Sequence, residues 1–312
     1  MTQINYKTIG FYLLCVLLSV LFIFSGYTKL FPIEYFEISL LSSKISNWAM
    51  APYMARLMIG LEFAIGLMLL IPGKWQQYAL KGSIALLVVF IIYLSILIAI
   101  YGNSGSCGCF GETIPMSPLQ GILKNVGLIV MAWAALLLKP NSRIAIPNFV
   151  NILLCLCCII ITFIVNPILL NPELRNDNTQ VGKPYNLSVL YQHAIYKPKV
   201  DVTKGKWLLA FFSTACAHCK LAAKTLAIIQ QQNPQVKTFF IVNGDTAKVT
   251  KFLDENNCKN IPWQNFKGPK EWLQIAGPEL PNILLLQNDT VVKKLEQYTL
   301  NGDKISKWFD EK

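Results

Sequence analysis

Charged side chains are scarce in this sequence. They make up 14% of its 312 residues, against about 25% in an average globular domain, whereas 54% of the residues are hydrophobic. This balance excludes an ordinary soluble enzyme. It also excludes a disordered chain, because a sequence this apolar can bury enough surface to offset its ordering entropy. The absence of a glycine repeat and of sustained heptads excludes collagen and a coiled coil.

Long blocks of like charge are also missing. The net charge is +11 without any run of five or six like charges, so nucleic acid is not indicated as a partner and an anionic membrane surface is weakly favoured. Residues 1–170 hold 9 Lys/Arg and 4 Asp/Glu, whereas residues 171–312 hold 19 and 13. This division predicts a membrane domain over 1–170, a polar linker over 171–180 and a soluble domain over 181–312.

Five apolar stretches are long enough to cross the roughly 30 Å hydrocarbon layer of a bilayer. They cover about residues 8–28, 50–71, 78–101, 119–138 and 148–170. A cleavable signal peptide is the alternative for the first stretch, but its apolar run exceeds the usual roughly 7–15 residues and no small-x-small site follows Gly26. We therefore expect a bundle of five membrane-spanning helices.

The basic residues collect on one side of these spans. The flanks that lack acidic residues contain Lys7, Lys74, Lys81, Lys139 and Arg143. The opposite flanks contain Glu34, Glu37 and Glu112 beside Lys29 and Lys44. Because Lys and Arg favour the cytoplasmic side, the pattern predicts an integral protein of the bacterial cell membrane, with the 102–118 loop and the soluble domain on the extracytoplasmic side.

Two ionisable residues, Arg56 and Glu62, lie within the second predicted span. Such residues are costly in a membrane and often functional. In one interpretation Arg56 snorkels at the outer end of the helix while Glu62 forms hydrogen bonds inside the bundle. In the other, Glu62 has a role with a quinone or a proton.

The 102–118 loop contains Cys107-Gly-Cys109, flanked by glycines that leave both thiols accessible. The pair could be a redox dithiol, half of a metal site, or two partners of structural bridges. A metal is disfavoured, because no second ligand pair and neither of the two histidines lies nearby. A redox dithiol is the first choice on the extracytoplasmic side.

Three segments of the membrane domain together resemble the DoxX/MauE group of membrane proteins. They are Phe24-Ser-Gly-Tyr-Thr-Lys-Leu30, Leu61-Glu62 followed by Gly66, and Cys107-Gly-Cys-Phe-Gly111. Over about residues 8–140, the resemblance implies a four-helix bundle involved in disulfide maturation of exported proteins beside a thioredoxin-like partner. Its DoxX side also allows a quinone-linked respiratory subunit. The fifth span departs from this four-helix pattern and would place the tethered C-terminal domain on the outer side of the membrane.

Cys15, Cys155, Cys157 and Cys158 lie within the predicted spans at comparable depth. They could form an intramembrane dithiol relay. The favoured interpretation is that they are small apolar side chains among leucines and isoleucines.

The soluble domain alternates strand and helix patterns. Strands are predicted over 206–212, 236–242, 282–286 and 291–295, and helices over 217–232, 246–256 and 301–311. A parallel βαβ unit followed by an antiparallel hairpin and a helix predicts an α/β fold.

Between the first strand and its helix lies Cys216-Ala-His-Cys219. A sulfur at a helix N-terminus is favoured as a thiolate, and a second sulfur one turn away can displace a mixed disulfide. His218 would further stabilise the thiolate. Zinc needs two more ligands, for which only the scattered His193 and Cys258 are candidates.

Residues 181–312 resemble the thioredoxin superfamily, near its TlpA-like and DsbA-like branches. The resemblance rests on Phe211-Phe-Ser-Thr-Ala-Cys-Ala-His-Cys-Lys220 and on Leu280-Pro281 at the cis-proline position. It implies that Cys216 is the nucleophile, that Cys219 resolves, and that Pro281 shapes the substrate groove. Two departures are Ala215, where tryptophan is usual, and Ala210, where thioredoxin buries an aspartate. Cys258 is expected to be structural.

We therefore expect a membrane-anchored thiol–disulfide oxidoreductase that acts on exported cysteine-containing proteins or another thiol–disulfide protein. Electrons would pass between the Cys107/Cys109 and Cys216/Cys219 pairs. The alternatives are a quinone-linked subunit and a non-catalytic assembly factor that holds client cysteines. The sequence leaves the direction of electron flow open.

Overall fold

The computed structural model describes residues 6–43, 45–103, 116–140, 147–168, 181–185, 187, 200–266, 269–277 and 279–311. The chain divides into two compact units, Met1–Ile168 and Leu169–Lys312. The predicted linker, the Cys107/Cys109 pair and His193 lie outside the described residues.

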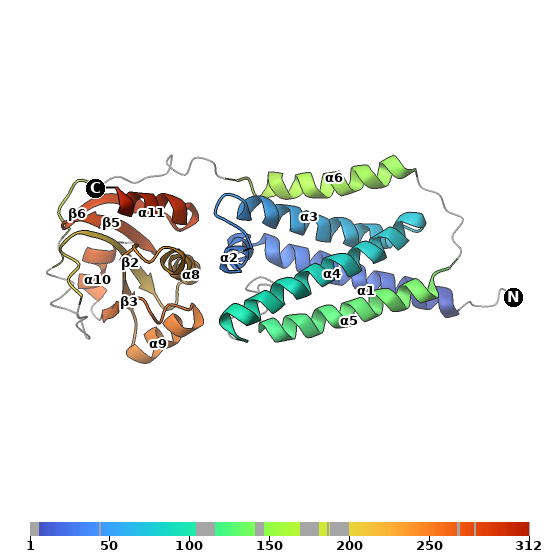
Figure 1. The fold of residues 1–312 in the computed structure, drawn as a ribbon, viewed down its shortest axis with the longest axis horizontal. Helices are drawn as coiled ribbons and strands as arrows, with labels where there is room; N and C mark the ends of the chain where they lie inside the picture. The colour runs from blue at the N-terminus through green and yellow to red at the C-terminus, as the bar shows by residue number, and fades with distance from the viewer. Residues whose placement is uncertain are drawn as a thin grey trace. The chain divides into compact units, whose positions relative to one another are not determined.

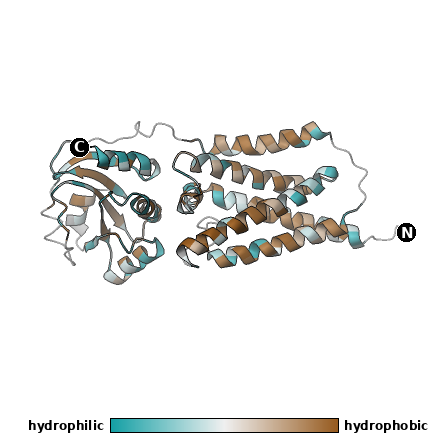
Figure 2. Ribbon diagram, viewed as in Figure 1, coloured by the Kyte–Doolittle hydropathy of each residue, from teal (hydrophilic) through white to brown (hydrophobic). Residues whose placement is uncertain are grey.

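The first unit is built from five long apolar helices (Figure 1). They are α1 (Tyr6–Leu30), α3 (Ala51–Leu70), α4 (Lys74–Tyr101), α5 (Pro118–Leu138) and α6 (Asn148–Val165). Each is long and apolar enough to cross a membrane. Figure 2 shows the hydrophobic colour running along these helices, and many of their large apolar side chains face outward. The expected helical membrane bundle is confirmed.

A short helix that the sequence pattern did not predict, α2 (Glu34–Ser42), lies between α1 and α3 along the chain. It packs against α3, with Phe36 and Leu40 buried. Its nine residues are too few for a span, and its acidic first turn resembles a polar flank. The helix is therefore recognisable only from its packing.

Helix α3 packs against α1, α4 and α6. Two glycines permit the close approach of its neighbours. A Cβ atom at Gly60 would lie 2.7 Å from the Cα atom of Ile159 in α6, and one at Gly66 would lie 2.8 Å from Cγ1 of Ile23 in α1. Ser19 also donates a hydrogen bond to the Gly66 carbonyl at 2.7 Å. Small residues at such crossings are typical of membrane helix packing.

The second unit contains a five-stranded sheet in the order β4-β3-β2-β5-β6. The strands are β2 (Lys206–Ser213), β3 (Thr238–Asn243), β4 (Trp263–Phe266), β5 (Asn282–Gln287) and β6 (Thr290–Leu295). β2, β3 and β4 run parallel, whereas β5 is antiparallel to both β2 and β6. Asn288 and Asp289 form the hairpin turn with positive φ, as two-residue turns require.

Helices α8 (Ala217–Gln232), α9 (Thr246–Glu255), α10 (Pro269–Ala276) and α11 (Gly302–Asp310) accompany the sheet (Figure 1). Trp272 of α10 packs on Phe211, and Phe252 of α9 packs on Phe212, the next residue of β2. Because successive side chains of a strand point to opposite faces, α9 and α10 cover opposite faces of the sheet. The strand order, together with the cis peptide Leu280–Pro281 before β5, gives the expected thioredoxin-like fold.

Candidate functional site

Cys216 lies between the end of β2 and the first turn of α8. It is the N-cap residue of α8, and its Sγ accepts a hydrogen bond from the backbone N–H of Cys219 at 3.2 Å. Ser and Asp oxygens usually fill this position, because the first N–H groups of a helix lack partners within the helix. Here a sulfur fills it and provides the acceptor for the Cys219 N–H.

The two sulfurs of the motif differ in access. Cys216 is partly exposed, whereas Cys219 is 0% exposed. Burial raises the pKa of the Cys219 thiol, and the hydrogen bond and charge of Cys216 raise it further, while a backbone hydrogen bond at Ser213 lowers it. A disulfide from outside can therefore reach the first sulfur and not the second.

The loop before β5 lies beside the first sulfur. Cys216 Sγ is 3.9 Å from the carbonyl oxygen of Leu280, the residue that precedes cis Pro281. The fold thus brings Cys216 and the Leu280-Pro281 segment together across 64 positions of sequence.

His218 is exposed on the first turn of α8. Its Nδ1 lies 3.2 Å from the hydroxyl oxygen of Tyr298, and the two rings meet edge to face with centroids 6.1 Å apart. His218 thus has a hydrogen-bond partner in Tyr298, and its support of the Cys216 thiolate stays a prediction. Sequence reasoning did not select Tyr298, which lies in the short 3₁₀ helix Gln297–Thr299.

The two departures from the thioredoxin pattern occupy different environments. Ala215 is exposed beside Cys216. Ala210 is 0% exposed in the middle of β2, where it pairs with Phe240 and Ile283. A methyl group at position 210 provides no acceptor for the proton of a buried thiol.

In the helical unit, Glu62 of α3 forms an ion pair with Lys29 of α1, and both side chains are 3% exposed. Ser25 donates to Glu62 Oε1 at 3.3 Å and accepts from Lys29 Nζ at 3.0 Å. Sequence reasoning selected Glu62 without its partner. The available signal was the i, i+4 spacing of Ser25 and Lys29, which places both on one face of α1.

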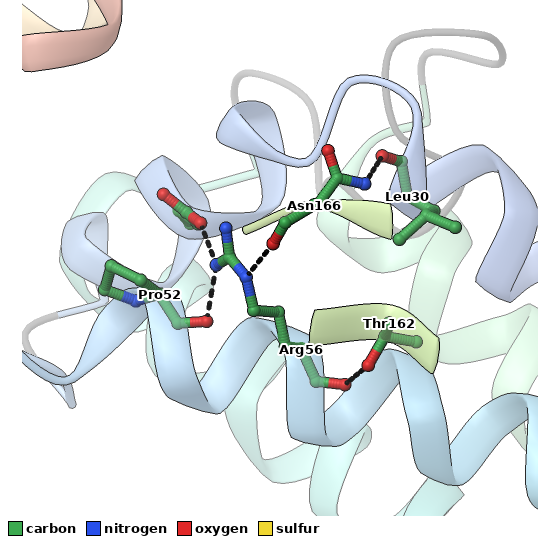
Figure 3. Close-up of polar contacts among 6 residues, drawn as sticks. Leu30, Pro52, Arg56, Thr162 and Asn166 are labelled. Carbon is green, nitrogen blue, oxygen red and sulfur yellow. Dashed lines mark hydrogen bonds and ion pairs between the residues drawn. The ribbon is translucent and has the colours of Figure 1, made fainter. Parts of the chain in front are cut away.

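Arg56 does not take part in this cluster. Its Nη1 donates to Glu37 Oε1 at 2.6 Å and to the Pro52 carbonyl at 2.7 Å, and its Nε donates to the Asn166 carbonyl at 2.6 Å. Thr162 donates to the Arg56 carbonyl at 3.0 Å. Figure 3 shows the guanidinium bonded to the Pro52 and Asn166 carbonyls, and Thr162 bonded to the backbone carbonyl of Arg56. The expected snorkelling is wrong, since Arg56 is 4% exposed and protein oxygens replace water around it.

The other described cysteines occupy several different environments. Cys15 is buried among apolar residues of the helical unit, and Cys155 packs against the same group. Cys158 is buried, whereas Cys157 is exposed on α6. Cys258, after α9, has its Sγ 3.5 Å from the Ala223 carbonyl, and burial raises its pKa to about 12.

Comparison with known proteins gives a match for each half. Residues 7–138 match the family model of the methylamine utilisation protein MauE. Protein TlpB of Flavobacterium psychrophilum is 28% identical over 342 aligned residues, which cover 93% of this chain and 92% of that protein. The chain is thus an integral membrane protein with a MauE-like part and a thioredoxin-like domain.

Two solved structures are similar at low TM-scores. A secreted disulfide oxidoreductase of Mycobacterium tuberculosis, homologous to E. coli DsbE, has 19% identity and a TM-score of 0.29, with 34% of this chain and 81% of that chain covered. A thioredoxin-like protein of Bacteroides caccae has 15% identity and a TM-score of 0.28, with 88% and 92% covered. The fold assignment rests instead on the strand order and the cis-proline position.

Proposed function

We propose that this protein is a membrane-anchored thiol–disulfide oxidoreductase, with Cys216 as the nucleophile and Cys219 as the resolving thiol. Its substrates are proteins that carry cysteine pairs. The observation that carries the proposal is the asymmetry of the motif. The Cys216 sulfur is accessible at a helix N-terminus and accepts a hydrogen bond from the backbone N–H of Cys219, whereas the Cys219 sulfur is buried.

The exchange takes place in two displacements. The Cys216 thiolate attacks one sulfur of a substrate disulfide, forming a mixed disulfide and releasing the other substrate sulfur as a thiolate, which takes up a proton. Cys219 then loses its proton and attacks Cys216 Sγ. The substrate leaves as a dithiol and the protein holds the Cys216–Cys219 disulfide. Two electrons have passed to the substrate, and the reverse sequence oxidises a substrate dithiol.

The test uses the full chain in detergent with a disulfide substrate. Cys216→Ser is expected to abolish exchange, because no accessible sulfur remains in the motif. Cys219→Ser is expected to accumulate mixed disulfides at Cys216, visible on non-reducing gels. Cys258→Ser is the matched control and is expected to leave exchange unchanged. Full function of Cys219→Ser would instead favour an assembly factor that holds client cysteines.

We further propose that Cys107/Cys109 exchanges electrons with Cys216/Cys219 on the extracytoplasmic side. Support comes from the sequence: the Lys/Arg asymmetry assigns both pairs to one side of the membrane, and a tether raises the effective concentration of the second dithiol to order mM. One pair is oxidised as the other is reduced, through an intrachain mixed disulfide.

The relay is tested by trapping that intermediate. In Cys219→Ser, a Cys216 disulfide to Cys107 or Cys109 is expected in non-reducing peptide maps. Its absence, together with an unchanged in-cell redox state of Cys216/Cys219 when both loop cysteines are serine, would make the loop pair structural. In wild-type cells, acid-quenched thiol labelling then gives the direction: mostly disulfide indicates an oxidase or isomerase circuit and mostly dithiol a reductase.

A further inference from the structure

The helical unit contains a cavity of about 210 Å³ beside the Lys29–Glu62 ion pair. Its apolar walls include Phe22 and Phe90, and its polar lining consists of Ser25, Lys29, Glu62, Lys124 and Asn125. The lining residues come from helices α1, α3, α4 and α5 and from the segment just before α5. The cavity therefore belongs to the MauE-like part of the chain.

Two buried polar atoms at this cavity have no hydrogen-bond partner among the described residues. They are Oε2 of Glu62, an acceptor, and Nδ2 of Asn125, a donor. Each residue is only 2% exposed. Leaving a buried polar group without a hydrogen bond is costly, so two such atoms lining one cavity indicate an occupant that satisfies both.

The ion pair itself is well supported. Lys29 Nζ lies 4.4 Å from the centre of the Phe90 ring, in addition to its contacts with Glu62 and Ser25. The first carboxylate oxygen of Glu62 is thus used within the protein. The second oxygen is left to accept a hydrogen bond from a ligand.

We propose that this cavity binds an apolar molecule from the bilayer whose ring-sized head carries a hydroxyl group. A hydroxyl donates to Glu62 Oε2 and accepts from Asn125 Nδ2, which neither an ether nor a hydrocarbon can do. An engineered cavity of about 150 Å³ binds benzene, so this volume holds one ring with its hydroxyl. The aromatic walls match such a ring.

The probe is para-octylphenol with a photoreactive diazirine in its chain, applied to the full protein in lipid nanodiscs. Labelling of peptides from α3 and α5 is expected, with competition by unlabelled para-octylphenol and not by octylbenzene, which lacks the hydroxyl. Equal competition by octylbenzene would overturn the proposal, because the polar atoms would then have no part in binding.

Asn125→Leu removes the unpaired donor and keeps the side chain's size. We expect it to weaken para-octylphenol binding by about tenfold, the loss of one hydrogen bond. Asn151→Leu is the matched control: Asn151 is also buried, in α6, and does not line the cavity. An equal loss of para-octylphenol affinity in the two variants would show that Asn125 does not contact the ligand and would overturn the proposal. Should Asn125→Leu fail to fold, the octylbenzene comparison in the wild-type protein decides the question.

Competition with a ring compound and with a linear alcohol tests whether the ligand needs a ring as well as a hydroxyl group. Displacement of the probe by a decylated hydroquinone and not by dodecanol supports the site with a redox-active ring compound as its ligand. Displacement by both would overturn the ring part of the proposal, because dodecanol carries a hydroxyl group and no ring. Displacement by neither would overturn the proposal. Since the readout is binding, it is independent of Cys216 chemistry.

Discussion

The buried thiol of Cys219 determines how the second displacement depends on pH. Because burial raises its pKa, the reactive thiolate is a minor species at neutral pH, and its fraction grows about tenfold per pH unit below the pKa. The methyl side chain of Ala210 cannot accept the proton of this thiol. We expect the rate at which the second substrate thiol is released to increase about tenfold per pH unit between pH 6 and 8.

Stopped-flow measurement of that release gives the test. The control is the first displacement, followed over the same pH range in Cys219→Ser. A release rate that does not change with pH, or that follows the control, would show that deprotonation of Cys219 does not limit the step.

Cys258 provides a contrast at the residue scale. Its full burial, which raises its pKa to about 12, predicts that the thiol stays almost entirely protonated at pH 8. Brief treatment of the native protein with iodoacetamide is expected to alkylate Cys216 and to leave Cys258 unmodified, as read by peptide mass spectrometry. Denatured protein is the control, in which Cys258 is expected to react. Native alkylation of Cys258 would contradict its structural role.

At the scale of elements, α6 is fixed to α3 and is more than a flexible tether. Gly60 permits backbone contact with Ile159, Thr162 donates to the Arg56 carbonyl, and Asn166 is bound by Arg56 on one side and by the Leu30 carbonyl on the other. The family match ends at residue 138, before this helix begins. The added span is therefore docked by residues of the MauE-like part.

Because α6 packs closely on α3, adding one methyl group at Gly60 is expected to lower the stability of the helical unit. Gly60→Ala places a Cβ 2.7 Å from the Ile159 Cα, and backbone cannot move aside as a side chain can. We expect a loss of about 1–3 kcal/mol in unfolding free energy. Gly82→Ala in α4 is the control, since nothing lies within 4 Å of a Cβ there. Thermal unfolding in detergent compares the two, and equal midpoints would mean that α6 does not pack here.

At the scale of the whole molecule, the two units are joined by one chain and are compact by themselves. A fragment covering residues 178–312 contains the complete five-stranded sheet and the Cys216 motif. We expect it to fold as a soluble domain with a cooperative unfolding transition and to exchange disulfides unless Cys216 is replaced. Circular dichroism and a disulfide-reduction assay test this. An unfolded fragment would show that the domain needs the membrane part.

The orientation of the chain is a second prediction at this scale. The Lys/Arg pattern places the 102–118 loop and the C-terminus outside and the 139–147 loop inside. Tags in these three segments, probed from outside intact cells, give the result directly. If the 102–118 tag and the C-terminus were found on opposite sides, direct exchange between the two dithiols would be ruled out.

The sequence by itself determined the features that depend on local pattern. Hydrophobic length identified the five long helices, although α4 begins at Lys74 and not at 78, and α6 ends at Val165 and not at 170. The patterns of the soluble domain identified β2, β3, β5 and β6 and the helices α8, α9 and α11, to within about two residues at each end. The Cys216-to-Cys219 spacing and its position between strand and helix identified the candidate site. Each of these follows from neighbours along the chain, because a span, a strand or a helix N-terminus is formed by consecutive residues.

Only the tertiary structure decided the features that depend on contacts between distant residues. The strand β4 and the helix α10 have four and eight residues, too few for a periodic signal, and are stabilised by pairing with β3 and packing on Phe211. Lys29, the ion-pair partner of Glu62, lies 33 positions away, and the partners of Arg56 include Asn166, 110 positions away. The burial of Cys219, beside an accessible Cys216 three residues earlier, likewise follows from packing. These features depend on which side chains come into contact after folding, because the reactivity and charge of a group are set by the residues packed around it.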